Sequence, residues 1–452
     1  MPASAAQERL WMLQEALPGL PFFNVLYTLR VTSPCNVAVL ERSINEVIQR
    51  HEILRTTFAV RDGRYVQVVA PQSILALPFE DLTALPPSEK EALGLQRIHD
   101  ELVHVFDLAK GPLIRARLMQ LEQPQYILLI SMHQVICDGW SLGVLAEEIA
   151  TLYDAFSTGG NSPLAPLPFQ YADYAHWQRR WKSNPEIVAQ LAYWREQLRE
   201  PLPNIELAKS GDRSALDNLR TARRRWVLPA SLAEAARRFS RQEGGTLFMA
   251  LVAALKTLLH RYLGQDDLRV ATNVANRNRP GTELLIGPLV NTVVLRTNLG
   301  GDPSPREVLR RVRTTTLEAF EHQDLPFEEL ALTLETERDL RPESLAQVMI
   351  LLQNTTLRPR ARSEGSLAFE EADPTLISPL VTTTTFDAIF AMVETRVGLV
   401  GTCIYKPNLF SVETIDRLVR DFERTIEQMV ARPERPISAI RVSGMRNDRA
   451  EN

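Results

Sequence analysis

The sequence lacks several features that would assign a function class at once. Its 452 residues include three cysteines, which are too widely spaced for a zinc pattern and cannot all pair. No apolar run approaches the ~18 residues of a membrane span, and the first residues lack the charged-then-apolar order of a signal peptide. These absences favour a reduced, cytoplasmic protein without a metal site.

An excess of charge is also missing. The chain has 51 basic and 55 acidic residues, a net charge of −4. We therefore expect neither nucleic acid nor a membrane surface as a partner. Apolar residues make up 45% and charged residues 23%, as in ordinary globular proteins. The length exceeds one compact core and predicts two or three domains.

Helical and strand-like patterns alternate along both halves of the chain. The predicted helices are residues 5–17, 37–50, 142–156, 171–198, 231–263 with a break at residues 244–246, 305–322 and 411–431. The predicted strands are residues 25–31, 65–69, 113–121, 126–130, 268–273, 290–297, 348–353, 367–369, 388–394 and 397–405. This order predicts α+β lobes packed side by side, with room for a ligand site between them.

One stretch is clearly a linker by composition. Residues 157–168 are small, polar and rich in Gly and Pro, so we place the lobe boundary there. The prediction is an N-terminal lobe of residues 1–165 and a C-terminal lobe of residues 166–452. Residues 201–222 are poorly patterned and are predicted to be a loop.

The most informative motif follows the strand predicted at residues 126–130. Residues 133–139 read His-Gln-Val-Ile-Cys-Asp-Gly. This resembles the His-His-x-x-x-Asp-Gly motif of the condensation domains of non-ribosomal peptide synthetases, with Gln134 in place of the second His. Further stretches similar to that family's motifs occur in the family's order, at residues 4–13, 50–58, 171–177, 286–296, 322–328 and, loosely, 338–348. The resemblance covers the whole chain.

The resemblance implies a particular architecture. Two chloramphenicol-acetyltransferase-like lobes would form a V-shaped pseudo-dimer around a central tunnel. A floor loop is expected at about residues 283–297 and a latch at about residues 378–396. Donor and acceptor carrier proteins would dock on opposite sides, and each would extend a phosphopantetheine arm inward, so the chain itself would bind no cofactor. We expect a monomer, and a stand-alone protein rather than an excised domain.

The implied function is that of a condensation-type acyltransferase, which joins a carrier-bound acyl or peptidyl thioester to an amine in non-ribosomal peptide or hybrid polyketide biosynthesis. Two alternatives stay open: a catalytically silent module that docks carrier proteins or recruits a tailoring enzyme, and an acyltransferase that uses a free coenzyme A thioester. Epimerisation domains usually read Val-Ser-Trp after the motif, where this chain has Trp140 and Ser141, so that class is disfavoured. Heterocyclisation domains replace the histidines with aspartate, which this chain does not.

The candidate catalytic residues are His133, Gln134, Asp138 and Gly139. Gln134 can donate and accept hydrogen bonds but cannot take a proton, unlike an imidazole. His133 should point away from Gln134, because adjacent side chains on a strand face opposite sides, and we expect it to be structural. An α-amine is partly unprotonated at neutral pH, so positioning alone could sustain amide formation, about 10²- to 10⁴-fold slower than with a base. An alcohol acceptor needs a base, so ester formation is disfavoured.

Asp138 is expected to be structural, because the resemblance implies that it holds an arginine across the site. Arg277 is the preferred partner and Arg55 the second choice. Gly139 permits close backbone approach and precedes a helix N-terminus. Cys137 could be a nucleophile, but the family commonly carries Ser or Cys there, which favours a packing role.

Overall fold

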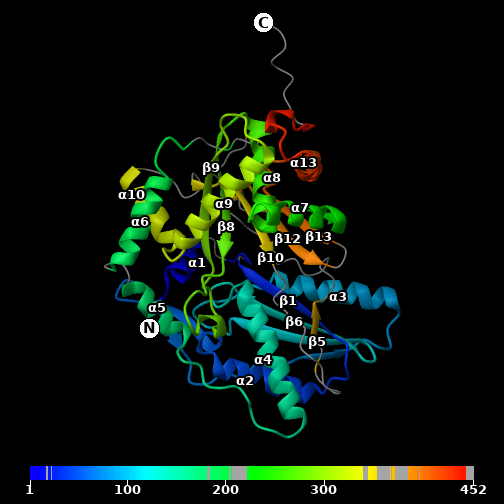
Figure 1. Ribbon diagram of the computed structural model, residues 1–452. Coiled ribbons are helices and arrows are strands. Elements are labelled where there is room, and N and C mark those ends of the chain that lie inside the picture. The colour runs from blue at the N-terminus through cyan, green and yellow to red at the C-terminus, as the bar shows by residue number, and fades with distance from the viewer. Residues whose placement is uncertain are drawn as a thin grey trace. The chain divides into compact units, whose positions relative to one another are not determined.

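The computed structural model describes most of the chain and divides it into two compact units. The described residues are 1–452 except 17–18, 22, 181–183, 203–204, 206–220, 339–344, 354–366, 368, 372–384, 396–397 and 444–452. Unit 1 consists of Met1–Asn184, Ala275–Val290 and Thr356–Thr382, and unit 2 of Pro185–Val274, Asn291–Thr355 and Thr383–Asn452. Each unit combines helices with a mixed sheet, so the predicted α+β class is confirmed (Figure 1).

Both units are discontinuous in sequence. The predicted lobes, residues 1–165 and 166–452, were continuous, whereas two later segments return to unit 1. Local patterns do not reveal such returns, since they report only on neighbouring residues. The assignment of domains stays a prediction.

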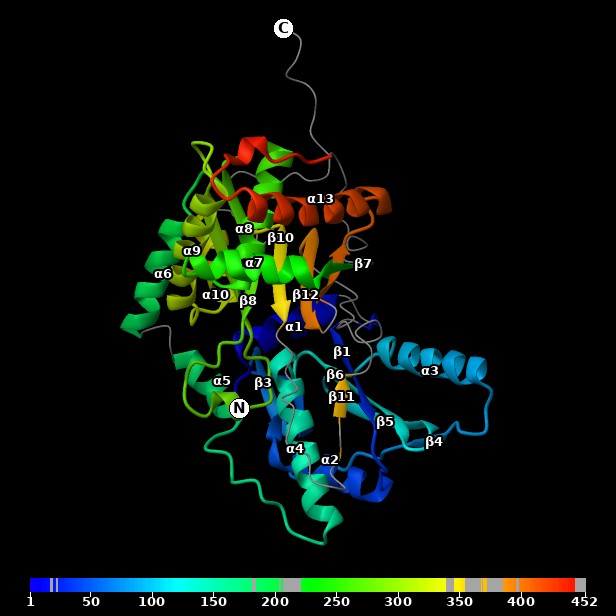
Figure 2. The same ribbon diagram turned by 45° about the vertical axis from the view of Figure 1, so that its right-hand side comes forward.

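The sheet of unit 1 has the strand order β11-β1-β6-β5-β4. Its strands are β1 (Asn24–Val31), β4 (Phe79–Asp81), β5 (Ile114–Glu122), β6 (Gln125–His133) and β11 (Phe369–Glu371). β6 lies at the centre and pairs antiparallel with β1 and β5, so the predicted hairpin is confirmed. β11 pairs antiparallel with β1, far from it in sequence (Figure 2). A separate hairpin joins β2 (Thr56–Arg61) to β3 (Arg64–Val69).

Helices cover both faces of this sheet. They are α1 (Ala5–Ala16), α2 (Val37–Arg50), α3 (Pro87–Leu102), α4 (Gly139–Ser157) and α5 (Tyr171–Arg180), with a short 3₁₀ helix η1 (Glu52–Arg55). The main core contains the buried residues of α2 and α4, and a second cluster lies under α3 on the other face (Figure 2). The observed bounds of α2 are those predicted, and Asn36 caps it by accepting the N–H groups of the second and third helical residues.

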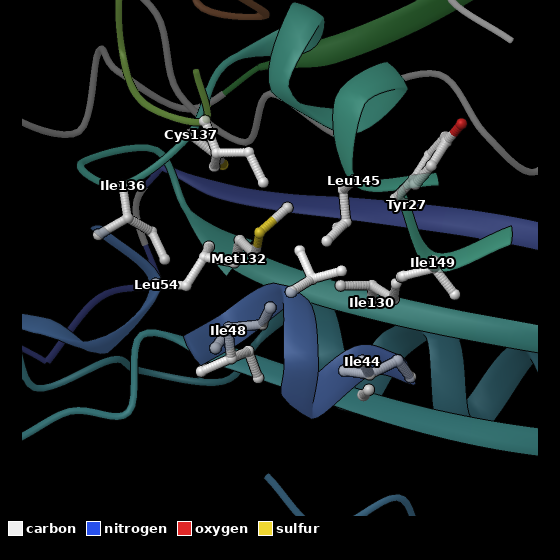
Figure 3. Packing of buried hydrophobic residues seen from close by; sticks show 14 of the residues in the cluster. Tyr27, Ile44, Ile48, Leu54, Ile130, Met132, Ile136, Cys137, Leu145 and Ile149 are labelled. Atoms are coloured by element: carbon white, nitrogen blue, oxygen red, sulfur yellow. The ribbon is translucent and has the colours of Figure 1, made fainter. Parts of the chain in front are cut away.

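The core fixes the strand that leads to the motif. Ile130 and Met132 of β6 are fully buried and pack with Ile44 and Ile48 of α2 and with Ile149 of α4 (Figure 3). Burying each such side chain stabilises the fold by about 1.5–3 kcal/mol. The motif therefore begins at the end of a firmly packed strand.

Unit 2 contains a six-stranded sheet with the order β7-β13-β12-β10-β8-β9. Its strands are β7 (Ala222–Pro229), β8 (Asp267–Val274), β9 (Asn291–Asn298), β10 (Val348–Gln353), β12 (Ala388–Thr395) and β13 (Gly398–Tyr405). Its helices are α6 (Pro185–Gln197), α7 (Ala230–Gln242), α8 (Leu247–Leu263), α9 (Pro305–Glu321), α10 (Phe327–Arg338) and α13 (Val412–Ala431). α8 contacts α7, α9 and α13, α7 also contacts α13, and the four helices form a layer over the sheet (Figure 1). Two further 3₁₀ turns are η4 (Thr282–Leu284) in unit 1 and η5 (Ile437–Ala439) in unit 2.

Several predicted elements need correction. The helix predicted at residues 171–198 is two helices, α5 and α6, and α6 begins at Pro185, a residue suited to the first helical turn. The range predicted for the floor loop, residues 283–297, overlaps β9, which begins at Asn291 as the strand prediction at residues 290–297 implied, and the assignment of a floor loop stays a prediction. Among the described elements, the strands β2, β4 and β7, the helices α3 and α10 and the three 3₁₀ helices were not predicted from the sequence.

Other predictions lie partly outside the described residues. The loop at residues 201–222 is mostly among them, as are residues 378–384 and 396 of the predicted latch, while β12 occupies most of the rest of that range. Within the described ranges, no single helix is long and apolar enough to cross a membrane. The pair α7 and α8, bent by 101° at its break, meets those criteria by length and composition.

Candidate active site

The end of β6 separates the first two motif residues onto opposite sides. His133 is the last residue of the strand and is 0% exposed, whereas Gln134 is exposed. The Gln134 N–H donates to the Phe23 carbonyl oxygen at 2.8 Å, which ties the first residue after β6 to the residue before β1. The predicted opposition of the two side chains is therefore present.

His133 is held by hydrogen bonds on both ring nitrogens. Its Nδ1 accepts the Val135 N–H at 3.0 Å, and its Nε2 lies 2.9 Å from Gln14 Oε1. The bond to Nδ1 leaves the ring proton on Nε2, which donates to Gln14. The rings of Phe23 and Phe106 contact the imidazole edge to face, each with centroids 6.2 Å away. His133 thus orients the turn that follows it.

Asp138 uses both carboxylate oxygens fully. Its Oδ1 accepts from the Ser141 N–H at 2.9 Å, the Ser141 hydroxyl at 2.8 Å and Arg277 Nη2 at 3.0 Å. Its Oδ2 accepts from Arg277 Nη1 at 2.8 Å and from the N–H groups of Leu289 and Val290 at 3.0 Å each. The carboxylate caps α4 and at the same time holds residues 275–290 against it.

Arg277, the partner predicted for Asp138, forms this ion pair. Its side chain is 1% exposed and also donates to the carbonyl oxygens of Leu285 and Gly287. Arg55, the second choice, lies elsewhere: it belongs to η1, and its guanidinium donates to the Ala70 carbonyl oxygen and pairs with Glu52.

The start of α4 leaves open space beside the motif. Gly139 is exposed, and a Cβ built on it would meet no atom within 4 Å. The next residue, Trp140, donates its indole N–H to the Glu283 carbonyl oxygen at 3.0 Å, and the Arg277 guanidinium lies 5.6 Å from its ring. A ligand group could therefore approach the first backbone N–H groups of a 19-residue helix.

Cys137 is part of the core rather than of a reactive site. It is 0% exposed, and its thiol donates to the His133 carbonyl oxygen at 3.6 Å (Figure 3). Burial, with the negative charge of Asp138 as a second cause, raises the pKa of this thiol well above its ordinary value. A thiolate nucleophile is thus disfavoured. The described part of the chain contains no group of three or more side chains that could hold a metal ion.

Sequence reasoning missed two contributors to this arrangement. Ser141 completes a capping box with Asp138, and its position three residues after the cap was a usable signal. Gln14 on α1 had no such signal, because its contact with His133 spans 119 residues.

Comparisons with known proteins identify the family. The condensation-domain family model matches residues 1–449. A protein of the linear gramicidin synthase of Brevibacillus parabrevis is 42% identical over 440 residues, which cover 97% of this chain but 9% of that protein. Phosphinothricin tripeptide synthetase PhsC of Streptomyces viridochromogenes is 35% identical over 98% of this chain and 40% of its own length. This chain therefore spans a minor part of these relatives.

Solved structures match along nearly their full length. The X-domain from teicoplanin biosynthesis is 26% identical with a TM-score of 0.81, and the match covers 98% of this chain and 97% of that one. The SgcC5 protein of Streptomyces globisporus is 28% identical with a TM-score of 0.81, covering 96% and 100%. The fold is the expected chloramphenicol-acetyltransferase-like α+β fold. From the motifs, the family model and these relatives, the chain belongs to the condensation-domain family of non-ribosomal peptide synthetases.

Proposed function

We propose that this chain is an amide-forming condensation domain that transfers an acyl or peptidyl group from a carrier-bound thioester to an amine. The observation that supports this most is the intact support around an exposed Gln134. Asp138 and Arg277 hold the motif turn with paired hydrogen bonds, and the open side of Gly139 leaves room for a substrate. This arrangement would keep Gln134 in a fixed position next to the space beside Gly139.

Gln134 would act by positioning. Its amide can accept a hydrogen bond from the attacking amine or donate one to the thioester oxygen. Holding the amine near the carbonyl carbon can supply much of the acceleration without proton transfer by Gln134. His133, Asp138 and Arg277 would keep the turn in place, while Gly139 lets the thioester approach the helix N-terminus.

The chain would bind no cofactor of its own. The two substrates would arrive on the phosphopantetheine arms of donor and acceptor carrier proteins, as the family membership and the synthetase relatives suggest. The alternative donor is a free acyl coenzyme A. Replacing the loaded donor carrier protein by acyl coenzyme A in the assay tests this alternative.

A second function has a specific observation in its favour. A solved X-domain in complex with the protein OxyB matches this chain at 26% identity and a TM-score of 0.78. Because residues 133–139 lack the imidazole of the second motif His, a domain that docks carriers or recruits another enzyme is the competing proposal.

A single-turnover assay separates the two. A donor carrier protein loaded with each of a panel of aminoacyl groups is mixed with glycyl-loaded acceptor carrier, and the products are read by mass spectrometry. We expect dipeptidyl product on the acceptor carrier, above the rate without this chain. If no donor in the panel gives product although the carrier proteins still bind, the competing proposal of a docking or recruitment domain is favoured.

A further inference from the structure

The turn that follows β6 is built around an uncharged imidazole. The Val135 N–H donates to His133 Nδ1 at 3.0 Å. A backbone N–H can only donate, so Nδ1 must be an acceptor that carries no proton. The ring of His133 therefore has its single proton on Nε2. A second proton would set two donors against each other at Nδ1 and remove the acceptor of the Val135 N–H.

Gln14 on α1 meets the other ring nitrogen with its amide oxygen. Gln14 Nε2 donates to the Phe106 carbonyl oxygen at 3.0 Å, and a carbonyl oxygen can only accept. This contact decides which end of the amide points to the ring, and it leaves Gln14 Oε1 2.9 Å from His133 Nε2. An acceptor at this place matches the Nε2–H tautomer. Because the amide is uncharged, it does not favour a protonated ring as a carboxylate would.

The helix α1 holds the peptide of Val135 at both ends. Gln7 lies two turns before Gln14 on the same face of α1 and is 0% exposed. Its Nε2 donates to the Val135 carbonyl oxygen at 3.2 Å, while Gln14 acts on the Val135 N–H through the ring of His133. One face of one helix thus fixes the residue that directly follows the exposed residue of the motif.

Titratable side chains on the elements around this ring have partners of their own. They are Glu15 with Tyr65, Glu101 with Arg115, His104 against Phe106, Asp107 with Lys110, Asp138 with Arg277, and Cys137 with the carbonyl oxygen of His133. The ring of His133 is itself 0% exposed. Its protonation state is therefore controlled at close range by Gln14 and Val135.

We propose that Gln14 is a positioning residue of this site. It keeps His133 neutral in the Nε2–H tautomer, and the neutral ring holds the turn that presents Gln134. The effect on the reaction rests on the proposed function, whereas the state of the ring does not. If His133 took a second proton, the Val135 N–H would lose its acceptor, and the Gln134 side chain would leave its place next to the space beside Gly139.

The test replaces the amide of Gln14 by a carboxylate. Gln14→Glu keeps the length of the side chain and adds a charge that favours a protonated ring. Gln14→Met removes both hydrogen bonds without adding a charge. Gln49→Glu is the matched control, because Gln49 is an exposed residue of α2 whose amide also donates to a backbone carbonyl oxygen, that of Pro71. Melting curves of the four proteins check that the variants fold.

Single-turnover rates are measured from pH 6 to 9 with the fastest substrate pair of the panel, and each variant is expressed as a ratio to the parent, which removes the protonation of the amine. We expect the Gln14→Glu ratio to fall by about 10²-fold at pH 6 and to recover toward pH 9, because the protonated fraction of the ring decreases as the pH rises. The Gln14→Met ratio should be reduced by a smaller factor that does not depend on pH. Gln49→Glu should stay within about twofold of the parent throughout.

The state of the ring is measured without any substrate. In nitrogen-15 spectra of protein labelled at histidine, a neutral ring gives two well-separated signals and a protonated ring gives two similar ones. The signals of His133 are those that change in Gln14→Met and not in Gln49→Glu. We expect a neutral Nε2–H ring in the parent from pH 6 to 9, and a protonated ring in Gln14→Glu at pH 6.

The outcomes separate this inference from the proposed function. A parent ring that is protonated, or that carries its proton on Nδ1, overturns the role of Gln14 whether or not amide forms. A Gln14→Glu ratio that does not change with pH in an active protein overturns it as well. A parent protein that forms no amide overturns the proposed function and the effect on rate, while the spectrum still decides the state of the ring. A pH-dependent loss in Gln14→Glu together with a protonated ring supports the assignment.

Discussion

Asp138 joins three parts of unit 1 through one side chain. It caps α4, pairs with Arg277 in a bidentate ion pair and accepts two backbone N–H groups at residues 289 and 290. Because the Arg277 side chain is itself 1% exposed, the ion pair is buried, and either partner alone would be an uncompensated charge.

Asp138→Ala should therefore destabilise unit 1 by about 3–5 kcal/mol. The reason is that the buried Arg277 guanidinium would lose the charge partner with which it forms its ion pair, and two backbone N–H groups would lose their acceptor. The measurement is a urea unfolding curve of the parent and the variant. The double variant Asp138→Ala/Arg277→Met is the control, and it should recover part of the loss because it removes the unpaired charge. An Asp138→Ala protein as stable as the parent but inactive would instead make Asp138 catalytic.

Gln134→His should raise the rate of amide formation. The exposed position at the end of β6 is where the family places its second imidazole, and a group with a pKa near 6.5 adds proton removal to a site that already positions the amine. The rate of the variant should depend more steeply on pH below about 7, since the imidazole must be neutral to act.

A faster parent protein and an inactive Gln134→His variant would show that Gln134 has a dedicated role that positioning does not describe.

At the scale of elements, residues 275–290 are anchored to α4 and α5. The Tyr171 hydroxyl on α5 donates to the Pro288 carbonyl oxygen at 3.1 Å, and the Ser141 hydroxyl on α4 accepts the Gly287 N–H at 3.0 Å. Gly287 has a φ of +151° and packs against the Tyr171 ring. A Cβ added to Gly287 would be 2.1 Å from a ring carbon. The close approach requires glycine.

Gly287→Ala should lower the free energy of unfolding by about 1–3 kcal/mol, because the methyl group would force this segment away from Tyr171. Thermal melting of the two proteins measures the effect. Gly94→Ala is the matched control: Gly94 lies within α3 with nothing within 4 Å of an added Cβ, so alanine should stabilise the helix by about 0.5–1 kcal/mol. Equal melting temperatures for parent and Gly287→Ala would contradict the packing argument.

At the scale of the molecule, unit 1 depends on segments far along the chain. Residues 1–184 lack both the partners of Asp138 at residues 277, 289 and 290 and the strand β11, which pairs with β1. Independent folding of the first part of the chain would leave a buried carboxylate unpaired and an edge of β1 open.

A fragment of residues 1–184 should therefore lack the dispersed amide spectrum of a folded unit. Two-dimensional NMR of the labelled fragment is the measurement. Addition of a synthetic peptide of residues 275–290 should increase the dispersion, because it returns the arginine and the two N–H donors. A scrambled peptide of the same composition is the control. A cooperative melt of the fragment alone, at the temperature of the full chain, would show that the returning segments are not needed.

The sequence determined the local features of this protein. Helical spacing gave the bounds of α2, and two strand patterns around a short turn gave the β5–β6 hairpin. The alternation of side chains along a strand was enough to place His133 and Gln134 on opposite sides. These features depend on neighbouring residues, whose spacing is visible in the chain.

Tertiary structure decided which distant residues meet. Asp138 pairs with Arg277 and not with Arg55 because residues 275–290 pack against α4. The hydrogen bond between His133 and Gln14 likewise joins positions 119 residues apart. Contacts between distant segments depend on how the whole chain packs, and the spacing of residues along the sequence does not record that packing.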